Sequence, residues 1–201
     1  MKTLSEVKAE MLSAAKSKPV GGYAVFDRDG NVMAHAAMEF PHCYVDEEDL
    51  AWAKANGYRF EEEVINGRAL TWVFAKPVEN ELFQSADGKY YLEANLPEND
   101  DSFVTEKYSE KVKAERTSRI ADTDDYEKLS DITVQKSTRA KREALTDEEK
   151  AEVLAYRQSL RDFPQVEGFP FVEYPDIPEC IAYECEQKIE QRENMRRGYE
   201  H

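Results

Sequence analysis

The spacing of hydrophobic residues changes part-way along the chain. Up to about residue 95, apolar residues occur in short runs or alternate with polar ones between turn-forming residues, which is typical of β-strands. Beyond that point Tyr108, Val112 and Ile120 follow a helical spacing. The pattern predicts an α+β fold: a small N-terminal β-rich (hairpin) domain with short helices, followed by a mainly α-helical C-terminal domain.

The N-terminal half carries strong local signals for a helix and for hairpins. Thr3 and Glu6 have capping-box spacing and predict a short amphipathic helix that ends near Gly21. Asn66-Gly67 separates two apolar runs and predicts a type I′ hairpin, because both central residues of that turn need positive φ. The other elements predicted here are a hairpin around Asp27–Asn31, a small helix from Asp46 to Asn56 and a strand pair around Ala86–Lys89.

A polar, acidic segment with proline, Pro97–Ser102, predicts an exposed linker. We therefore expect an N-terminal domain over residues 1–96, a linker over 97–104 and a helical domain over 105–201. Thr146 and Glu149 form a second capping box at the start of a helix that Pro164 ends. A last helix is predicted from about Pro178.

The net charge excludes some classes of partner. The chain carries a formal charge of −15, which argues against nucleic acid and anionic membrane surfaces and favours a basic partner. The apolar run Ala69–Ala75 is far shorter than the roughly 20 residues of a membrane helix, and we expect neither a membrane span nor a secretion signal. An odd number of cysteines, Cys43, Cys180 and Cys185, predicts reduced thiols in the cytosol.

No motif for catalysis was found, so the sequence predicts a protein that is not an enzyme and has no cofactor and no metal. A zinc site made of His42, Cys43, Cys180 and Cys185 is disfavoured against buried thiols, because the cysteines lack knuckle spacing. Consecutive acids such as Glu61–Glu63 are predicted to form a solvated face, since side chains alternate along a strand.

The second half contains an ordered series of short motifs. In chain order they are Arg116, Arg119–Asp124, Leu129–Asp131, Leu145–Glu149, Tyr156–Asp162, Phe169-Pro170 and Tyr174-Pro175. Over about residues 112–178 this series resembles the C-terminal domain of phage tail assembly chaperone and tail fibre assembly proteins. Two positions depart from the family, because Tyr126 and Tyr174 stand where tryptophan is usual. Thr133–Arg142 is a basic insertion, interpreted as a loop or a helical extension.

The resemblance implies a non-enzymatic assembly chaperone that binds a phage tail or tail-fibre protein in the host cell cytoplasm during assembly. The candidate partner-binding residues are Tyr156, Arg157, Leu160, Arg161, Asp162, Phe169, Pro170, Tyr174 and Pro175. The candidate structural residues of the motif are Thr123, Asp124, Tyr126, Asp131, Thr146 and Glu149.

Physical reasoning gives these residues a second interpretation. In the favoured hypothesis Arg157 pairs with Asp124 or Asp131 and clamps two helices. In the other hypothesis Arg157 contacts a partner protein. The aromatic and proline residues from Phe163 to Pro178 form an extended segment that either packs on its own domain or is presented to a partner. Both alternatives stay open at the level of sequence.

The function also has alternatives. The same fold in the virion tail, as a tail, baseplate or fibre-attachment subunit, is the main competitor, and an acidic DNA mimic that inhibits host defence ranks lower because basic residues are interleaved with the acids. A homo-oligomer is possible. Whether Lys136–Arg142 docks an acidic fibre is left open.

Overall fold

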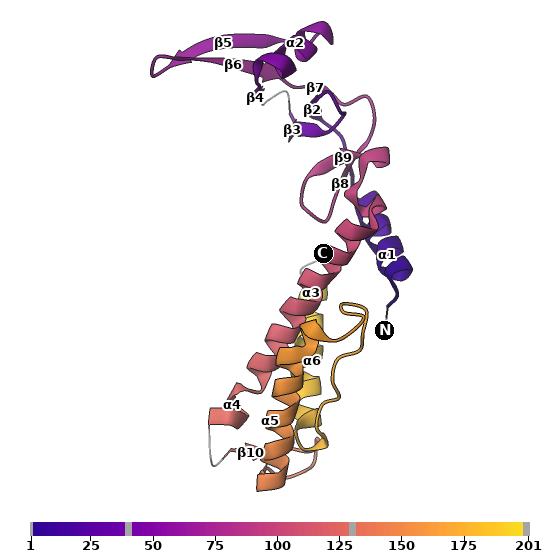
Figure 1. The fold of residues 1–201 in the computed structure, drawn as a ribbon, viewed down its shortest axis with the longest axis vertical. Helices are drawn as coiled ribbons and strands as arrows, with labels where there is room; N and C mark the ends of the chain where they lie inside the picture. The colour runs from indigo at the N-terminus through magenta and orange to yellow at the C-terminus, as the bar shows by residue number, and fades with distance from the viewer. Residues whose placement is uncertain (1, 39–41, 129–131, 199–201) are drawn as a thin grey trace. The chain divides into compact units, whose positions relative to one another are not determined.

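The computed structural model describes residues 2–38, 42–128 and 132–198. These residues divide into two compact units, an N-terminal unit over Thr3–Thr105 and a C-terminal unit that consists mainly of residues 106–198 (Figure 1). Small β-sheets with short helices make up the first unit and helices dominate the second. The predicted α+β fold class is therefore confirmed.

The described residues of the N-terminal unit form three antiparallel sheets of three strands each, in the orders β1-β8-β9, β3-β2-β7 and β4-β6-β5. Its helices are α1 (Leu4–Lys16), α2 (Glu47–Ala55), η1 (Glu93–Asn95) and η2 (Pro97–Asn99). Its strands are β1 (Pro19–Val20), β2 (Tyr23–Phe26), β3 (Val32–Ala36), β4 (His42–Tyr44), β5 (Phe60–Ile65), β6 (Arg68–Phe74), β7 (Lys76–Pro77), β8 (Leu82–Gln84) and β9 (Tyr90–Leu92).

The local signals of this half are confirmed, except that α1 ends at Lys16 and not near Gly21, because Pro19 and Val20 form β1 and pair with β8. The Thr3 hydroxyl accepts from the Glu6 N–H, and the Glu6 carboxylate accepts from the Thr3 N–H at 2.7 Å, so the capping box at α1 is complete. Asn66 and Gly67 have φ values of 51° and 76°, as a type I′ turn requires. The flanking pair is Ile65 and Arg68.

Two small cores hold the N-terminal unit together. One joins the β2 and β4–β6 sheets to α2, and its buried members are Val25, Val45, Ala53, Tyr58 and Val73. The other packs α1 against β8, and its buried members are Ala15, Phe83 and Leu96. Buried apolar residues are thus divided between small clusters. Single polar contacts therefore account for a larger share of the stability of this unit.

The prediction of an exposed linker over residues 97–104 is wrong. This segment forms η2 and the first turn of α3 (Asp101–Asp122), and Glu98 is fully buried. The Glu98 carboxylate accepts from the Ser85 hydroxyl at 2.8 Å and from the Ala86 N–H at 2.6 Å. A carboxylate can be buried here because the turn before β9 supplies hydrogen-bond donors that need an acceptor.

Substituting Glu98 with methionine is expected to lower the free energy of unfolding of the N-terminal unit by about 2–3 kcal/mol, because it leaves the buried Ser85 hydroxyl and the partly buried Ala86 N–H without their acceptor. Urea denaturation followed by tryptophan fluorescence measures this unit alone, since Trp52 and Trp72 both lie in it. Glu98→Gln, which keeps one acceptor oxygen, is the control and should lose less. An unchanged midpoint for Glu98→Met would contradict the assignment.

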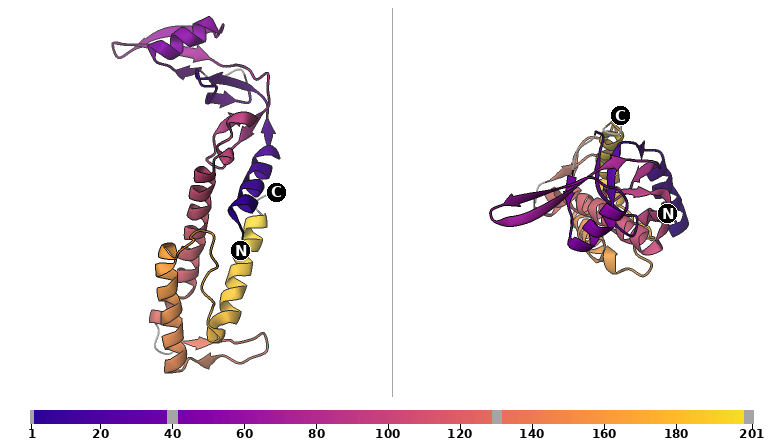
Figure 2. Two further views of the ribbon diagram at one scale, coloured as in Figure 1. Left: turned by 45° about the vertical axis from the view of Figure 1, so that its right-hand side comes forward. Right: turned by 90° about the horizontal axis from the view of Figure 1, so that it is seen from above.

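The C-terminal unit consists of helices that pack side by side and two very short strands (Figures 1 and 2). Besides α3, its elements are α4 (Asp124–Lys128), β10 (Thr133–Val134), β11 (Glu143–Ala144), α5 (Asp147–Asp162), η3 (Phe163–Gln165) and α6 (Glu179–Gly198). The predicted capping box at α5 is present, with Thr146 and Glu149 bonded reciprocally at 2.9 and 3.1 Å. The alternative that Thr133–Arg142 is a helical extension is wrong. The segment begins with β10 and continues as a loop to β11, and the two strands pair with each other.

Residues from α4, β10, α5 and α6 form one continuous core. Its buried members are Tyr126, Val134, Leu145, Val153, Tyr156, Leu160, Cys180, Ile181 and Cys185. Arg192 of α6 donates to Asp122 at 2.5 Å and to Glu115 at 3.2 Å on α3, which joins the first and last helices of the unit.

The cysteines lie in different environments. Cys180 and Cys185 are buried in the C-terminal core, whereas Cys43 is half-buried in the other unit. Among the described residues no group of three or more His, Cys, Asp or Glu side chains is placed to hold a metal ion. None of the helices in the described part of the chain is both long enough and apolar enough to span a bilayer.

Candidate functional site

Arg157 is the centre of the motif in the C-terminal unit. It lies on α5 with only 2% of its surface exposed. Its Nη1 donates to the Ile120 carbonyl at 2.9 Å and to the Thr123 hydroxyl at 2.7 Å. Its Nη2 donates to the Asp124 carboxylate at 2.9 Å. The guanidinium thus joins α5 to the end of α3 and the start of α4, which is the internal clamp that the sequence favoured.

The partners of Arg157 lie at the end of α3 and at the start of α4. The Ile120 carbonyl, in the last turn of α3, accepts from the Thr123 N–H at 3.1 Å and has a second lone pair for the guanidinium. Thr123 is fully buried and its hydroxyl also donates to Ile120 at 2.8 Å. Arg157 and Thr123 therefore both bond to the last turn of α3. Asp131, the other predicted acid partner, lies outside the described residues.

Several of the candidate partner-binding residues are not accessible in this structure. Tyr156 and Leu160 belong to the core, 5% and 0% exposed, and Pro170 is buried as well. Phe169, Tyr174 and Pro175 are half-buried, whereas Arg161 and Asp162 at the end of α5 are exposed. The shared stripe of Tyr156 and Leu160 was predicted correctly, but it faces inward. A contact with a partner remains a prediction, and only Arg161 and Asp162 present a largely open surface for it.

The aromatic segment Phe163–Pro175 packs on its own unit. Phe163, 1% exposed, stacks on Tyr174 at 4.7 Å and meets Phe169 edge-on at 5.6 Å. The Tyr174 hydroxyl donates to the Val112 carbonyl on α3 at 2.8 Å. The Arg119 guanidinium lies 4.0 Å above the Tyr174 ring, which favours a cation–π contact. This arrangement agrees with the hypothesis that the segment packs on its own domain. We call residues 163–175 the strap.

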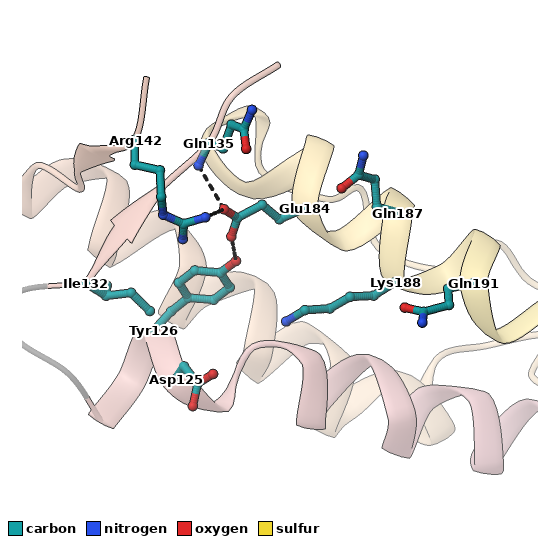
Figure 3. A pocket seen from close by; sticks show the side chains of 9 residues that line it. All are labelled: Asp125, Tyr126, Ile132, Gln135, Arg142, Glu184, Gln187, Lys188 and Gln191. Carbon is teal, nitrogen blue, oxygen red and sulfur yellow. Dashed lines mark hydrogen bonds and ion pairs between the residues drawn. The ribbon is translucent and has the colours of Figure 1, made fainter. Parts of the chain in front are cut away.

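Glu184 lies at the centre of the hydrogen bonds in the pocket shown in Figure 3, and no motif in the sequence indicated it. Its carboxylate on α6 accepts from the Tyr126 hydroxyl at 2.6 Å, from the Gln135 backbone N–H at 2.8 Å and from Arg142 at 2.9 Å. The pocket has a volume of about 380 Å³ and is lined by Asp125, Tyr126, Ile132, Gln135, Arg142, Glu184, Gln187, Lys188 and Gln191. One weak signal was available, since Glu184 lies directly beside a core cysteine on its helix.

The basic insertion is tied back to the helices at both ends. Lys136 pairs with Glu149 of α5 at 2.5 Å, and Arg142 pairs with Glu184. Arg139 and Lys141 are exposed and form no ion pair within the residues that the structure describes. Only these two cations of the insertion are thus open to an acidic partner, and a docking role for Lys136–Arg142 stays a hypothesis.

Burial, and then the hydrogen bond to Glu184, raises the pKa of Tyr126 above its usual value. A phenol that is harder to ionise in the folded state stabilises the fold at neutral pH, and this contribution is lost as the pH rises above the unfolded pKa of about 10. We expect the stability of the C-terminal unit to fall above this pH, and to fall less steeply in Tyr126→Phe. Urea denaturation followed by far-UV circular dichroism at neutral and at alkaline pH measures the difference. Equal slopes for the two proteins would contradict the role given to this hydroxyl.

The motif residues share a structural role. They bond to helix ends and hold the segments of the C-terminal unit together. Residues 109–179 match the phage tail assembly chaperone protein family. The match confirms the resemblance that the motifs indicated and supports a role in phage tail assembly. No curated protein and no solved structure matches the chain significantly.

The segment similar to the tail assembly chaperones begins within α3 and ends at the first residue of α6. It includes Arg157, the aromatic strap and Tyr126. Glu184 and the whole N-terminal unit lie outside the matched residues. The strap and the clamp are therefore features of the matched segment, whereas the Glu184 contacts join it to a helix beyond the match.

Proposed function

We propose that the chain is a non-enzymatic chaperone of phage tail or tail-fibre assembly, which binds a tail polypeptide in the host cytoplasm until that polypeptide is incorporated. The family match of residues 109–179 carries this proposal. Tail polypeptides that await assembly expose apolar surface and unpaired strand edges, and a stoichiometric partner that covers these regions prevents aggregation. The charge of −15 would keep such a complex soluble.

The internal clamp and the strap support a scaffold role for most of the motif. Arg157, Tyr156 and Leu160 are buried inside the unit, so we expect the contact surface to use exposed side chains. Leu154 is 46% exposed on α5, and Arg161 lies two turns further along the same helix face. We propose that this face of α5, Leu154 with Arg161, contributes to the partner surface.

Co-expression of the chain with each tail and fibre polypeptide of its own genome tests the proposal. The measured quantity is the soluble fraction of the partner after centrifugation, with and without the chain. We expect one partner to move from the pellet to the supernatant and to co-purify with the chain. A set of partners whose solubility does not change would contradict the proposed function.

A charge reversal at Arg161 tests the surface separately. Arg161→Glu should reduce the soluble fraction of the partner, whereas Lys111→Glu, an exposed charge reversal on α3, should not. Both proteins should keep the circular dichroism of the original chain. If Arg161→Glu retains full activity, the contact surface lies elsewhere while the chaperone function stands.

The lower-ranked hypothesis of a DNA mimic gains no support from the C-terminal unit. Several of its acids are paired with cations, for example Glu115 and Asp122 with Arg192. A mimic of phosphates needs a row of unpaired acids on one face.

A further inference from the structure

Strand β5 is the outer strand of the β4-β6-β5 sheet and, in the described part of the chain, pairs only with β6. The β5–β6 hairpin extends beyond α2 and β4 (Figure 1). All six side chains of β5 are exposed, and Val64 is the most exposed large apolar residue of this hairpin at 72%. An exposed outer strand is a template for another strand, unless its side chains prevent pairing.

The register shows which backbone groups of β5 are open. The Phe74 N–H donates to the Arg59 carbonyl at 2.8 Å, so this pair is hydrogen-bonded. Because hydrogen-bonded and non-bonded pairs alternate in an antiparallel ladder, the next bonded pairs along the register involve Glu61, Glu63 and Ile65. The N–H and C=O groups of the intervening residues, Phe60, Glu62 and Val64, therefore point away from β6.

The side chains of this edge have a distinct chemical pattern. Phe60 and Val64 share one face of the strand with Glu62 between them, whereas Glu61 and Glu63 lie on the other face. Glu61 and Glu62 form no ion pair within the described residues, and Glu63 accepts from the Trp72 indole N–H at 2.9 Å. Three consecutive carboxylates thus lie between two exposed apolar residues.

We propose that the β5 edge binds an extended, basic segment of a partner protein, which adds to the sheet as a further strand. In the bound pair the open N–H and C=O groups of Glu62 bond to the centre of the segment. Cross-strand neighbours then require three consecutive Lys or Arg residues opposite Glu61–Glu63, with apolar residues opposite Phe60 and Val64. The inference goes beyond the proposed function, because the N-terminal unit lies outside the segment that matches the tail assembly chaperones.

A second copy of this chain does not fit the same edge. Antiparallel pairing of two β5 strands about Glu62 would place Glu62 opposite itself and Glu61 opposite Glu63. Like charges directly opposite each other destabilise a strand pair. The same acids that disfavour self-association favour a basic strand, so charge complementarity selects the occupant.

The test uses the full chain and a fluorescent, end-capped peptide that contains Val-Lys-Lys-Lys-Val. Fluorescence anisotropy measures its dissociation constant. The comparison peptide carries a methyl group on the backbone nitrogen of the central lysine, so it keeps all three charges and loses one ladder hydrogen bond. We expect this methylation to weaken binding at least about tenfold, because pairing opposite Glu62 needs that N–H.

Two substitutions locate the site. Glu62→Lys should weaken binding of the unmethylated peptide at least about tenfold, whereas Glu81→Lys, an exposed and equal change of charge outside the hairpin, should change it by less than about twofold. Tryptophan fluorescence in urea checks that both variants fold.

Equal binding of the two peptides would overturn the inference, since it would show attraction by charge alone. Absence of binding to the unmethylated peptide, or a dimer in sedimentation that Glu62→Lys abolishes, would overturn it as well. These outcomes are independent of the co-expression test. A chaperone that binds its partner through α5 would still keep that partner soluble if the β5 edge bound no peptide.

Discussion

Replacing Arg157 with methionine is expected to destabilise the C-terminal unit by about 3–5 kcal/mol, because it removes one partner from a buried set of charge-assisted hydrogen bonds. Methionine fills much of the space of the arginine stem, so the expected loss comes mainly from polar groups. Thr123 is fully buried, so its hydroxyl loses a donor in a site away from solvent. The end of α3 would lose its link to α5.

Two spectroscopic probes separate this effect from changes in the other unit. Both tryptophans lie in the N-terminal unit, whereas most helical residues lie in the C-terminal unit. Arg157→Met should therefore shift the urea transition seen by far-UV circular dichroism and leave the transition seen by tryptophan fluorescence in place.

The matched control is Arg161→Met, one turn further along α5 and exposed. Its effect should stay within about 0.5 kcal/mol, as is usual for surface positions. Arg157→Lys should fall between the two, since an ammonium group keeps the charge but lacks the planar fork. Equal stabilities for Arg157→Met and Arg161→Met would show that the clamp contributes nothing to folding.

Truncation of Phe163 to alanine is the second large effect, with an expected loss of about 3–5 kcal/mol. The ring is 1% exposed and contacts both Phe169 and Tyr174, so its removal leaves a cavity under the strap. Hydrogen exchange should also show faster exchange of the Phe169 and Phe171 amides, which are bonded to the Val166 and Gly168 carbonyls, because the strap loses its anchor.

Val166→Ala is the control for the same segment. Val166 is 47% exposed, and its truncation should cost less than about 0.5 kcal/mol. Phe163→Leu should cost about 1–3 kcal/mol, since it conserves apolar character without the ring geometry. Unaltered exchange of the strap in Phe163→Ala would contradict the packing described here, even if global stability fell.

Features that depend on a few neighbouring residues could be predicted from the sequence. The capping boxes at Thr3 and Thr146 and the Asn66-Gly67 turn are local, because the donors and acceptors, or the required φ values, belong to residues three positions apart or fewer. The inward stripe on α5 follows from helical spacing. The sequence offered Asp124 or Asp131 as the acid that pairs with Arg157, and the structure shows the bond to Asp124.

Features that depend on distant segments were missed. The burial of Glu98 requires donors from Ser85 and Ala86, and an acidic, proline-containing segment is typical of an exposed linker when the donors are not known. Glu184 meets groups from Tyr126, Gln135 and Arg142, which only the folded chain brings together. The burial of Tyr156, Arg157 and Leu160 could not be predicted from the motif either, since a family pattern does not distinguish side chains used in folding from side chains used in binding.

A tail assembly chaperone, as proposed for this chain, assists assembly and is then released. Quantitative mass spectrometry of purified virions and of infected-cell lysate distinguishes release from incorporation. We predict that peptides of this chain are abundant in the lysate at the time of tail assembly and absent from mature particles. A fixed copy number per particle would rule out release and make the chain a structural subunit of the tail.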